Sequence, residues 1–142
     1  MKGLLFNILI VCNLILFSSF QKIDISKNID LIKVKDGQSL NEIFPIKDII
    51  EIKVTNYSGQ HILKGKELLN IKSQIGTAKY TGGLLVKPGH ILLNIKLKGN
   101  KDGGYVYAEN DLINFDTGKN LKGQNFSGSF RLNKSINFDN FH

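Results

Sequence analysis

The sequence predicts an α+β fold: a curved antiparallel sheet of about six to seven strands with one helix, about residues 66–75, packed on one face. Most of the chain consists of short segments in which apolar and polar residues alternate, as in half-buried strands. One segment instead places its apolar residues at helical spacing. The connections between successive strand segments are short, which favours antiparallel pairing. A small β-barrel with one helix is the alternative.

The first 20 residues have the pattern of a secretory signal peptide. Lys2 supplies the positive start, and residues 4–17 are almost wholly apolar. This run is shorter than the ~20 residues that span a bilayer, so we expect export to the periplasm or the extracellular space. Retention of the segment as an anchor is the alternative. Cys12 lies inside the apolar run rather than at its end, which argues against a lipid-modified cysteine. Residues 21–142 are then expected to form a single globular domain without cysteine.

The elements before the helix begin with a strand over residues 31–35, ended by an Asp-Gly turn. Ser39 and Glu42 have the spacing of a capping box, which predicts a brief helical turn. Residues 49–56 predict a second strand, one face of which carries three apolar side chains: Ile50, Ile52 and Val54.

The predicted helix, residues 66–75, places three apolar side chains on one stripe: Leu68, Ile71 and Ile75. No strong N-cap residue precedes it, so Gly65 is expected to serve. Gly76 follows at the position where helices commonly end in a left-handed residue.

The second half of the chain alternates strands with turns. The alternation is clearest over residues 91–98, after a Pro-Gly turn at residues 88–89, and we expect loops at residues 100–104 and 116–124. The strands are expected at residues 82–86, 91–98, 105–108, 112–115, 126–132 and 136–141.

The tetrapeptide Ile-Asn-Phe-Asp occurs twice, at residues 113–116 and 136–139. Its Ile and Phe are two residues apart, so on a strand they point to the same face, and the Asp is suited to start a turn. This structural interpretation is favoured over a calcium site at Asp116, Asn120 and nearby residues, because calcium needs several closely spaced carboxylates.

The charge balance is +7, with 19 Lys and Arg against 12 Asp and Glu. Arg131 is the only arginine, and arginine is the residue that recognises phosphates and bases best. We therefore expect no nucleic-acid partner and interpret the lysines mainly as solvated surface, with a mild attraction to anionic partners as a minor possibility.

The residue patterns of known catalytic chemistries are missing from the sequence. The domain has no cysteine, no Gly-x-Ser-x-Gly motif and no phosphate-binding loop, and its histidines, His61, His90 and His142, are not spaced as zinc ligands. We expect no catalysis, no cofactor and no bound metal.

The residues most suited to binding are Lys87, His90, Tyr105 and Tyr107, since two tyrosines on one strand face beside turns can form a contact patch. We expect an exported, non-catalytic domain that binds a protein or another macromolecule of the envelope, as an inhibitor, immunity or accessory protein does, and that is a monomer or weak dimer without stable membrane insertion. The alternative is a small-ligand carrier or small hydrolase whose pocket uses His61 or His90.

Overall fold

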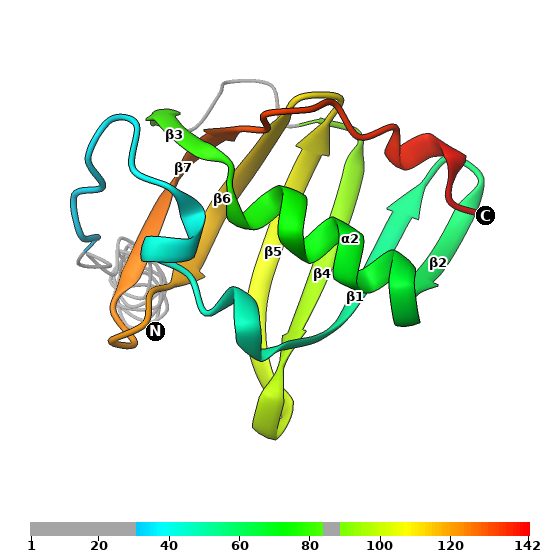
Figure 1. Ribbon diagram of the computed structural model, residues 1–142, viewed down its shortest axis with the longest axis horizontal. Helices are drawn as coiled ribbons and strands as arrows, with labels where there is room; N and C mark the ends of the chain where they lie inside the picture. The colour runs from blue at the N-terminus through cyan, green and yellow to red at the C-terminus, as the bar shows by residue number, and fades with distance from the viewer. Residues whose placement is uncertain (1–30, 84–88) are drawn as a thin grey trace, which may run out of the picture.

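One sheet of seven antiparallel strands organises the computed structural model of the chain, which describes residues 31–83 and 89–142 (Figure 1). The strand order is β2-β1-β4-β5-β6-β7-β3. The edge strands β2 and β3 do not pair with each other, so the sheet stays open. The predicted α+β fold is confirmed, and the barrel alternative is wrong. The strands are β1 (Ile49–Asn56), β2 (Gly59–Leu63), β3 (Lys79–Gly82), β4 (Ile91–Leu97), β5 (Lys101–Glu109), β6 (Leu112–Lys119) and β7 (Asn125–Arg131). The predicted signal peptide lies outside the described residues.

The two faces of the sheet differ in what covers them. The helix α2 (Gly65–Gly76) lies across one face, in front of β4 and β5 in Figure 1, together with the short 3-10 helices η1 (Leu40–Glu42) and η2 (Ile46–Asp48). We call this the inner face. Across β1, β4 and β5 no element of the described residues covers the opposite, outer face, and its side chains are half-buried or exposed.

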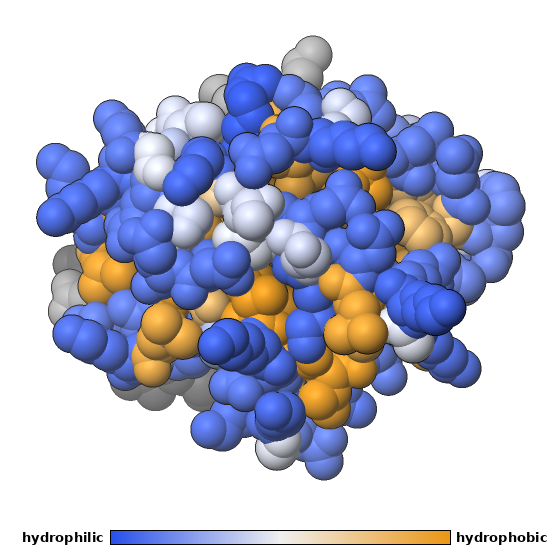
Figure 2. All heavy atoms as spheres, in the orientation of Figure 1, coloured by the Kyte–Doolittle hydropathy of each residue, from blue (hydrophilic) through white to orange (hydrophobic). Residues whose placement is uncertain are grey.

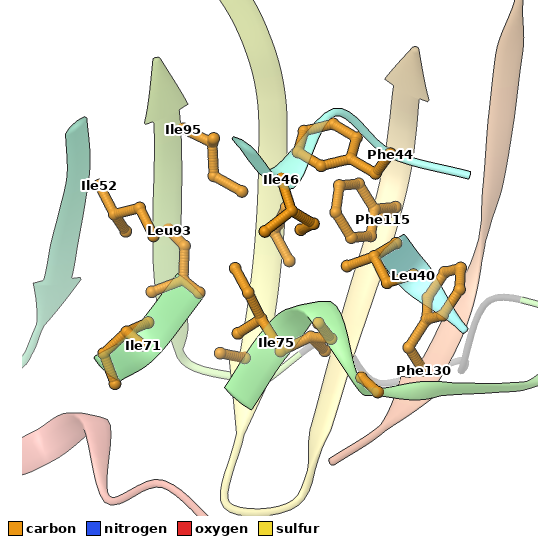
Figure 3. Close-up of a cluster of buried hydrophobic side chains, with 14 of the residues drawn as sticks. Leu40, Phe44, Ile46, Ile52, Ile71, Ile75, Leu93, Ile95, Phe115 and Phe130 are labelled. Atoms are coloured by element: carbon orange, nitrogen blue, oxygen red, sulfur yellow. The ribbon is translucent and has the colours of Figure 1, made fainter. Parts of the chain in front are cut away.

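The core lies between the inner face and these helices (Figure 3). Its largest group is an aromatic cluster in which the ring of Phe115 lies 5.1 Å from Phe44, 5.1 Å from Phe126 and 5.8 Å from Phe130, measured between centroids. All four side chains are buried. Burial of each contributes about 1.5–3 kcal/mol, and favourable ring pairs add about 0.5–1.5 kcal/mol. This cluster joins η1 and the following residues to β6 and β7.

The alternation predicted for residues 91–98 is confirmed in β4, where all four inward residues are buried: Ile91, Leu93, Ile95 and Leu97. In β1 the strand is confirmed, but the expectation that Ile50 shares a face with Ile52 and Val54 is wrong. The pairing register of β1 with β4 shifts between Ile49 and Glu51, so Ile49 is buried and Ile50 is 45% exposed. A bulge places two consecutive residues opposite one partner and reverses the alternation before it.

The helix is confirmed, with Ile71 and Ile75 buried and Leu68 packed against the core. Its N-cap is Lys64 rather than Gly65. The expected left-handed end at Gly76 is also wrong, because Gly76 is the last residue of the helix and the cap that follows, Thr77, has right-handed dihedral angles. A Cβ at Gly76 would lie 2.4 Å from the side-chain oxygen of Asn41 in η1, so this glycine serves close packing of two helices rather than a turn.

Several predicted boundaries move. Residues 32–35 form no strand, and Leu31 makes only an isolated bridge to Asn125. The capping box of Ser39 and Glu42 is present at η1, as predicted. The loop expected at residues 100–104 is shorter, since β5 already begins at Lys101, after the tight turn η3 (Lys98–Asn100). The strand predicted to stop before Asp116 continues to Lys119. Most of the strand expected over residues 82–86 lies outside the described residues, and the strand that is described here, β3, comes earlier, at Lys79–Gly82.

The two Ile-Asn-Phe-Asp segments have different structures. In the first, Asp116 does not end a strand but lies within β6, where the register against β7 shifts between Phe115 and Gly118. The second forms no strand: the Asn137 side chain accepts the Asp139 N–H at the start of η4 (Phe138–Asn140). What the segments share is the burial of their Ile and Phe side chains, the one part of the structural interpretation that is confirmed.

A C-terminal strap, residues 132–142, crosses one end of the sheet from β7 to the β1–β2 hairpin (Figure 1). Its backbone N–H groups at Leu132 and Ile136 donate to the carbonyls of Asp111 and Asn110 in the β5–β6 turn, at 2.7 and 2.8 Å. At its far end the Asn56 side chain donates to two strap carbonyls, those of Phe138 and Phe141, both at 3.0 Å. The strap therefore fastens the two hairpins to one another.

The two edge strands of the sheet differ in whether a further segment hydrogen-bonds to them. Residues 37–40 run beside β3, where Gly37 donates to Tyr80, Tyr80 donates to Gln38 and Leu40 donates to Ala78 at 2.9–3.0 Å. In the described part of the chain, the backbone of β2 bonds only to β1.

Candidate binding surface

The outer face carries the two predicted tyrosines. Tyr105 and Tyr107 lie on β5, flanking the buried Val106, so both side chains point away from the core. Tyr105 is 51% exposed and Tyr107 is half-buried. The sequence thus predicted correctly that these residues share one face. Lys87 lies outside the described residues.

Neighbouring strands extend this face into two rows. The register places Tyr105 beside Asn94 of β4 and Thr117 of β6, and the row continues through Lys53 to Ile62. The second row runs through Tyr107 and consists of Gln60, Thr55, Leu92, Tyr107, Asn114 and Ser129. Cross-strand neighbours on one face lie about 4.5–5.5 Å apart at their Cβ atoms, so the rows form a continuous surface as far as Thr117 and Tyr107. Asn114 and Ser129, at the end of the second row, are each only 2% exposed.

Two shallow hollows adjoin Asp102 on this surface. One, of about 290 Å³, is lined by Tyr105, Gly104 and Thr117 among others. The second, of about 390 Å³, includes Ile62 and Lys53. Gly103 and Gly104 allow the neighbouring strands to approach closely. A Cβ at Gly103 would lie 2.9 Å from the carbonyl oxygen of Ile95, and a Cβ at Gly104 would lie 2.7 Å from the carbonyl oxygen of Thr117. The face is therefore gently uneven rather than deeply cleft.

The charges of the hollows are mixed. Lysines and carboxylates alternate around them, and the two hollows are lined by Lys53, Lys96, Lys101 and Lys119 together with Glu51, Asp102 and Asp116. Such a mixture of signs, with tyrosine and isolated apolar side chains, resembles the composition of non-obligate protein interfaces.

His90 does not join the tyrosines. Its Nε2 lies 3.2 Å from both carboxylate oxygens of Asp139 in the strap, and its ring stacks on Tyr57 of the β1–β2 turn with centroids 4.7 Å apart. The predicted grouping of His90 with Tyr105 and Tyr107 thus separates into a tyrosine face and a contact with the strap.

His61 also contacts the strap. Its side chain is on the inner face, where Nε2 lies 3.0 Å from Oε2 of Glu67 in the first turn of α2, and Nδ1 lies 2.7 Å from the carbonyl oxygen of His142. The hydrogen bond to Glu67 raises the pKa of His61 above its usual value; partial burial and Lys64 oppose the rise, while the His142 carbonyl and the charge of Glu67 add to it. Phe141 stacks on the ring at a centroid distance of 5.7 Å.

These histidine–carboxylate pairs resemble the base and its orienting carboxylate in hydrolases that use a nucleophile, a histidine and a carboxylate. A general base also needs a nucleophile or water at its second nitrogen, but that of His61 is occupied by a backbone carbonyl. In the described ranges no hydroxyl side chain hydrogen-bonds either imidazole, and neither histidine lines the two hollows that adjoin Asp102. The arrangement is one that fastens a segment.

Two of the side chains near the calcium position that was weighed, Asp111 and Asn120, are engaged elsewhere. Asp111 pairs with Arg131, and the Asn120 side-chain oxygen accepts the N–H groups of Lys122 and Gln124 at 2.9 and 2.8 Å. Within residues 31–83 and 89–142, no three His, Cys, Asp or Glu side chains gather as metal ligands.

Sequence reasoning missed Asn56, which organises the strap. Its side-chain oxygen accepts the N–H groups of Ser58 and Gly59 in the hairpin turn, at 2.9 and 3.1 Å, while its amide donates to the strap. The Asn-x-Ser-Gly pattern is a signal for the turn. It carries no information on a strap more than 80 residues later.

Comparison with protein-family models, with curated proteins and with solved structures finds no match to this chain. Among the described residues, none of the helices has both the length and the apolar character needed to cross a bilayer.

Proposed function

We propose that the protein is an exported, non-catalytic domain that binds a partner protein through the outer face of its sheet. The observation that carries this proposal is Tyr105, a half-exposed aromatic side chain beside a hollow on a face that no described element covers. Tyrosine contributes strongly to protein interfaces because a rigid ring provides apolar area while its hydroxyl stays hydrated.

The partner is a folded protein with a fairly flat, polar surface. The outer face is broad, its hollows are shallow, and its charges alternate in sign, which suits a surface of complementary mixed charge rather than a small molecule or a polyanion. Inhibitors, immunity proteins and accessory proteins of the envelope bind folded proteins through surfaces of this kind.

The test is affinity capture from the envelope and culture fluid of the producing cell, with the full chain as the starting gene product. We expect one protein in stoichiometric amount, and its loss when Tyr105→Ser is introduced. Tyr57→Ser is the matched control, since Tyr57 is more exposed but belongs to the β1–β2 turn. Lys53→Glu tests the same face by charge reversal and is expected to weaken capture. Capture that survives both outer-face variants would contradict the proposal.

The second candidate is a small-ligand carrier or hydrolase that uses His61 or His90. The observation in its favour is that each imidazole contacts a carboxylate, Glu67 or Asp139. A thermal-shift screen with small metabolites and chromogenic esters tests it: stabilisation or turnover that His61→Gln or His90→Gln abolishes would support this candidate over the first.

A further inference from the structure

Two hollows meet at the end of the sheet opposite the strap. The first, of about 410 Å³, is bordered by three lysines, Lys98, Lys101 and Lys119, and we call it the lysine hollow. The second, of about 580 Å³, is lined by Phe44, Ile46 and other residues of the η1–η2 segment, and we call it the apolar trough. Pro45, Asp48 and Leu121 line both, so the two form one continuous depression.

The lysine hollow carries a net positive charge, because its three lysines outnumber its two carboxylates, Asp48 and Asp102. Asp48 is engaged by Lys98, with Nζ 3.6 Å from Oδ1, and Asp102 accepts the N–H of Gly104 at 2.8 Å. Within the described ranges, Lys101 and Lys119 form no ion pair. An anion entering the hollow would meet both ammonium groups without displacing an existing pair.

The positive charge of Lys98 also affects a neighbouring lysine, Lys72. Lys72 of α2 donates to the carbonyl of Ile49 at 2.6 Å, and its pKa is lowered first by burial and then by the positive charge of Lys98, with Asp48 opposing. At Lys72 the positive charge of Lys98 thus has a larger effect than the negative charge of Asp48.

The apolar trough exposes hydrocarbon to water at its junction with the lysine hollow. Leu121 is 61% exposed, yet its backbone is fixed, since its N–H donates to the carbonyl of Ile43 at 2.8 Å. The three side-chain hydrogen bonds of Asn120 to Lys122 and Gln124 hold the same loop. Figure 2 shows apolar atoms emerging among polar ones below α2 on this side of the molecule. A preformed apolar surface of this kind costs little ordering entropy when a ligand covers it.

We propose that this depression binds a single anionic amphiphile, with its hydrocarbon in the apolar trough and its carboxylate, phosphate or sulfate group among Lys98, Lys101 and Lys119. A site that combines lysines with an apolar trough binds an amphiphile better than it binds an anion or a hydrocarbon alone. A free inorganic anion leaves the trough wet, and a neutral hydrocarbon leaves the lysines without a partner. This site shares Lys101, Asp102 and Lys119 with the rims of the two hollows on the tyrosine face, but the proposal does not rest on the function proposed above.

The experiment is calorimetric titration of the protein, expressed as the full chain, with decyl phosphate below its micelle concentration. We expect saturable binding of one molecule. Decanol and inorganic phosphate, each carrying one half of the chemistry, are expected to bind at least about tenfold more weakly, equivalent to ~1.4 kcal/mol. Equal affinity for inorganic phosphate and decyl phosphate would overturn the amphiphile proposal.

Variants locate the site. The double variant Lys98→Gln, Lys101→Gln removes two exposed charges and is expected to weaken binding of decyl phosphate by about tenfold. Its control, Lys33→Gln, Lys35→Gln, makes the same change in charge elsewhere and is expected to change the affinity by less than about twofold. Leu121→Ser is expected to weaken binding about fivefold, with Leu69→Ser as its control because Leu69 is similarly exposed on α2. Unchanged affinity in both the lysine and the Leu121 variants would overturn the site.

Vesicles distinguish the source of the anion. If anionic vesicles bind the protein and lose it in the lysine variant, while monomeric decyl phosphate does not bind, the site for one amphiphile is excluded and surface attraction to anionic lipid replaces it. Binding of monomeric decyl phosphate without need of a bilayer supports the site as proposed.

Discussion

His61 of β2 and Glu67 of α2 are joined by an ion pair, with Nε2 and Oε2 3.0 Å apart, and the other nitrogen of the same imidazole meets the carbonyl oxygen of His142 at 2.7 Å. Both neighbours are hydrogen-bond acceptors. Neutral imidazole has one N–H and can donate to only one of them, whereas imidazolium donates to both. The geometry by itself therefore selects the protonated ring, in agreement with the raised pKa of His61.

Stability should depend on pH through this pair. A group whose pKa is higher in the folded than in the unfolded state, where histidine titrates near 6.5, stabilises fully below the unfolded value and loses that effect as pH rises through the folded value. We expect the difference in free energy of unfolding between the native protein and Glu67→Gln to be largest just below the usual histidine pKa of about 6.5 and to shrink as pH rises through the raised pKa of His61. Urea unfolding followed by circular dichroism at several pH values measures it.

The double variant His61→Gln, Glu67→Gln is the control for this experiment. It removes the titrating pair, so its stability relative to His61→Gln alone should not change with pH over the same range. A Glu67→Gln difference that stays constant or grows with rising pH would show that the imidazolium is not what fastens the strap.

The inner face should be far more sensitive to truncation than the helix surface. Leu93 of β4 is 1% exposed and faces α2 (Figure 3), whereas Leu69 on α2 is 64% exposed. We expect Leu93→Ala to lower the free energy of unfolding by about 2–5 kcal/mol, because it leaves a cavity, and Leu69→Ala to lower it by less than about 0.5 kcal/mol. Thermal and urea unfolding of the two variants, which share one chemical change, measure the contrast.

Gly128 and Gly59 separate backbone strain from crowding. Both have positive φ, 140° and 133°, but a Cβ at Gly128 would lie 2.4 Å from the Tyr80 ring and 2.8 Å from the carbonyl oxygen of Gly82, while one at Gly59 meets nothing within 4 Å. Gly59→Ala should cost about 1–2 kcal/mol from strain, and Gly128→Ala about 2–4 kcal/mol because crowding adds to it. Equal losses in urea unfolding would mean that β3 moves aside freely.

The buried pair of Ser129 and Asn114 should behave as one unit. Ser129 Oγ lies 2.6 Å from Asn114 Oδ1 and 3.0 Å from the carbonyl oxygen of Gly83, but it has only one hydrogen to donate. Ser129→Ala should cost about 1–3 kcal/mol, since it leaves buried acceptors without a donor. Adding Asn114→Leu removes one of those acceptors, so the double variant should be more stable than the sum of the single losses. Additive losses would contradict the coupling.

The sequence predicts best where one residue's environment depends on its own strand. The four inward residues of β4 and the apolar stripe of α2 follow from periodicity alone, because burial of one face repeats every second residue in a strand and about every 3.6 residues in a helix. The tyrosines of β5 belong to this class, which is why their common face was predictable.

The sequence predicts poorly where pairing with a second strand determines which way a side chain points or where a strand ends. Ile50 was expected to share a face with Ile52 and Val54, but a bulge against β4 leaves it exposed. Asp116 was expected to end a strand, but that strand continues to Lys119 through another irregularity against β7. A bulge is a property of the pairing rather than of either segment. The same limit applies to the histidines, since His90 reaches its carboxylate only because the strap brings Asp139 to it from 49 residues away.

Composition misled in one further place. The repeated Ile-Asn-Phe-Asp suggested two strands, but the second copy forms η4, with Asn137 capping it. Both copies bury their Ile and Phe, so the tetrapeptide determines which side chains enter the core and leaves the backbone to its surroundings.

The unequal edges of the sheet set a limit on self-association. Residues 37–40 occupy the backbone groups beside β3, and in the described chain only β2 offers a second row of donors and acceptors to an incoming strand. Two copies that join through β2 use up the one edge of each that the described residues leave open. Association by this route therefore stops at a closed pair related by a twofold axis and cannot propagate into a fibre.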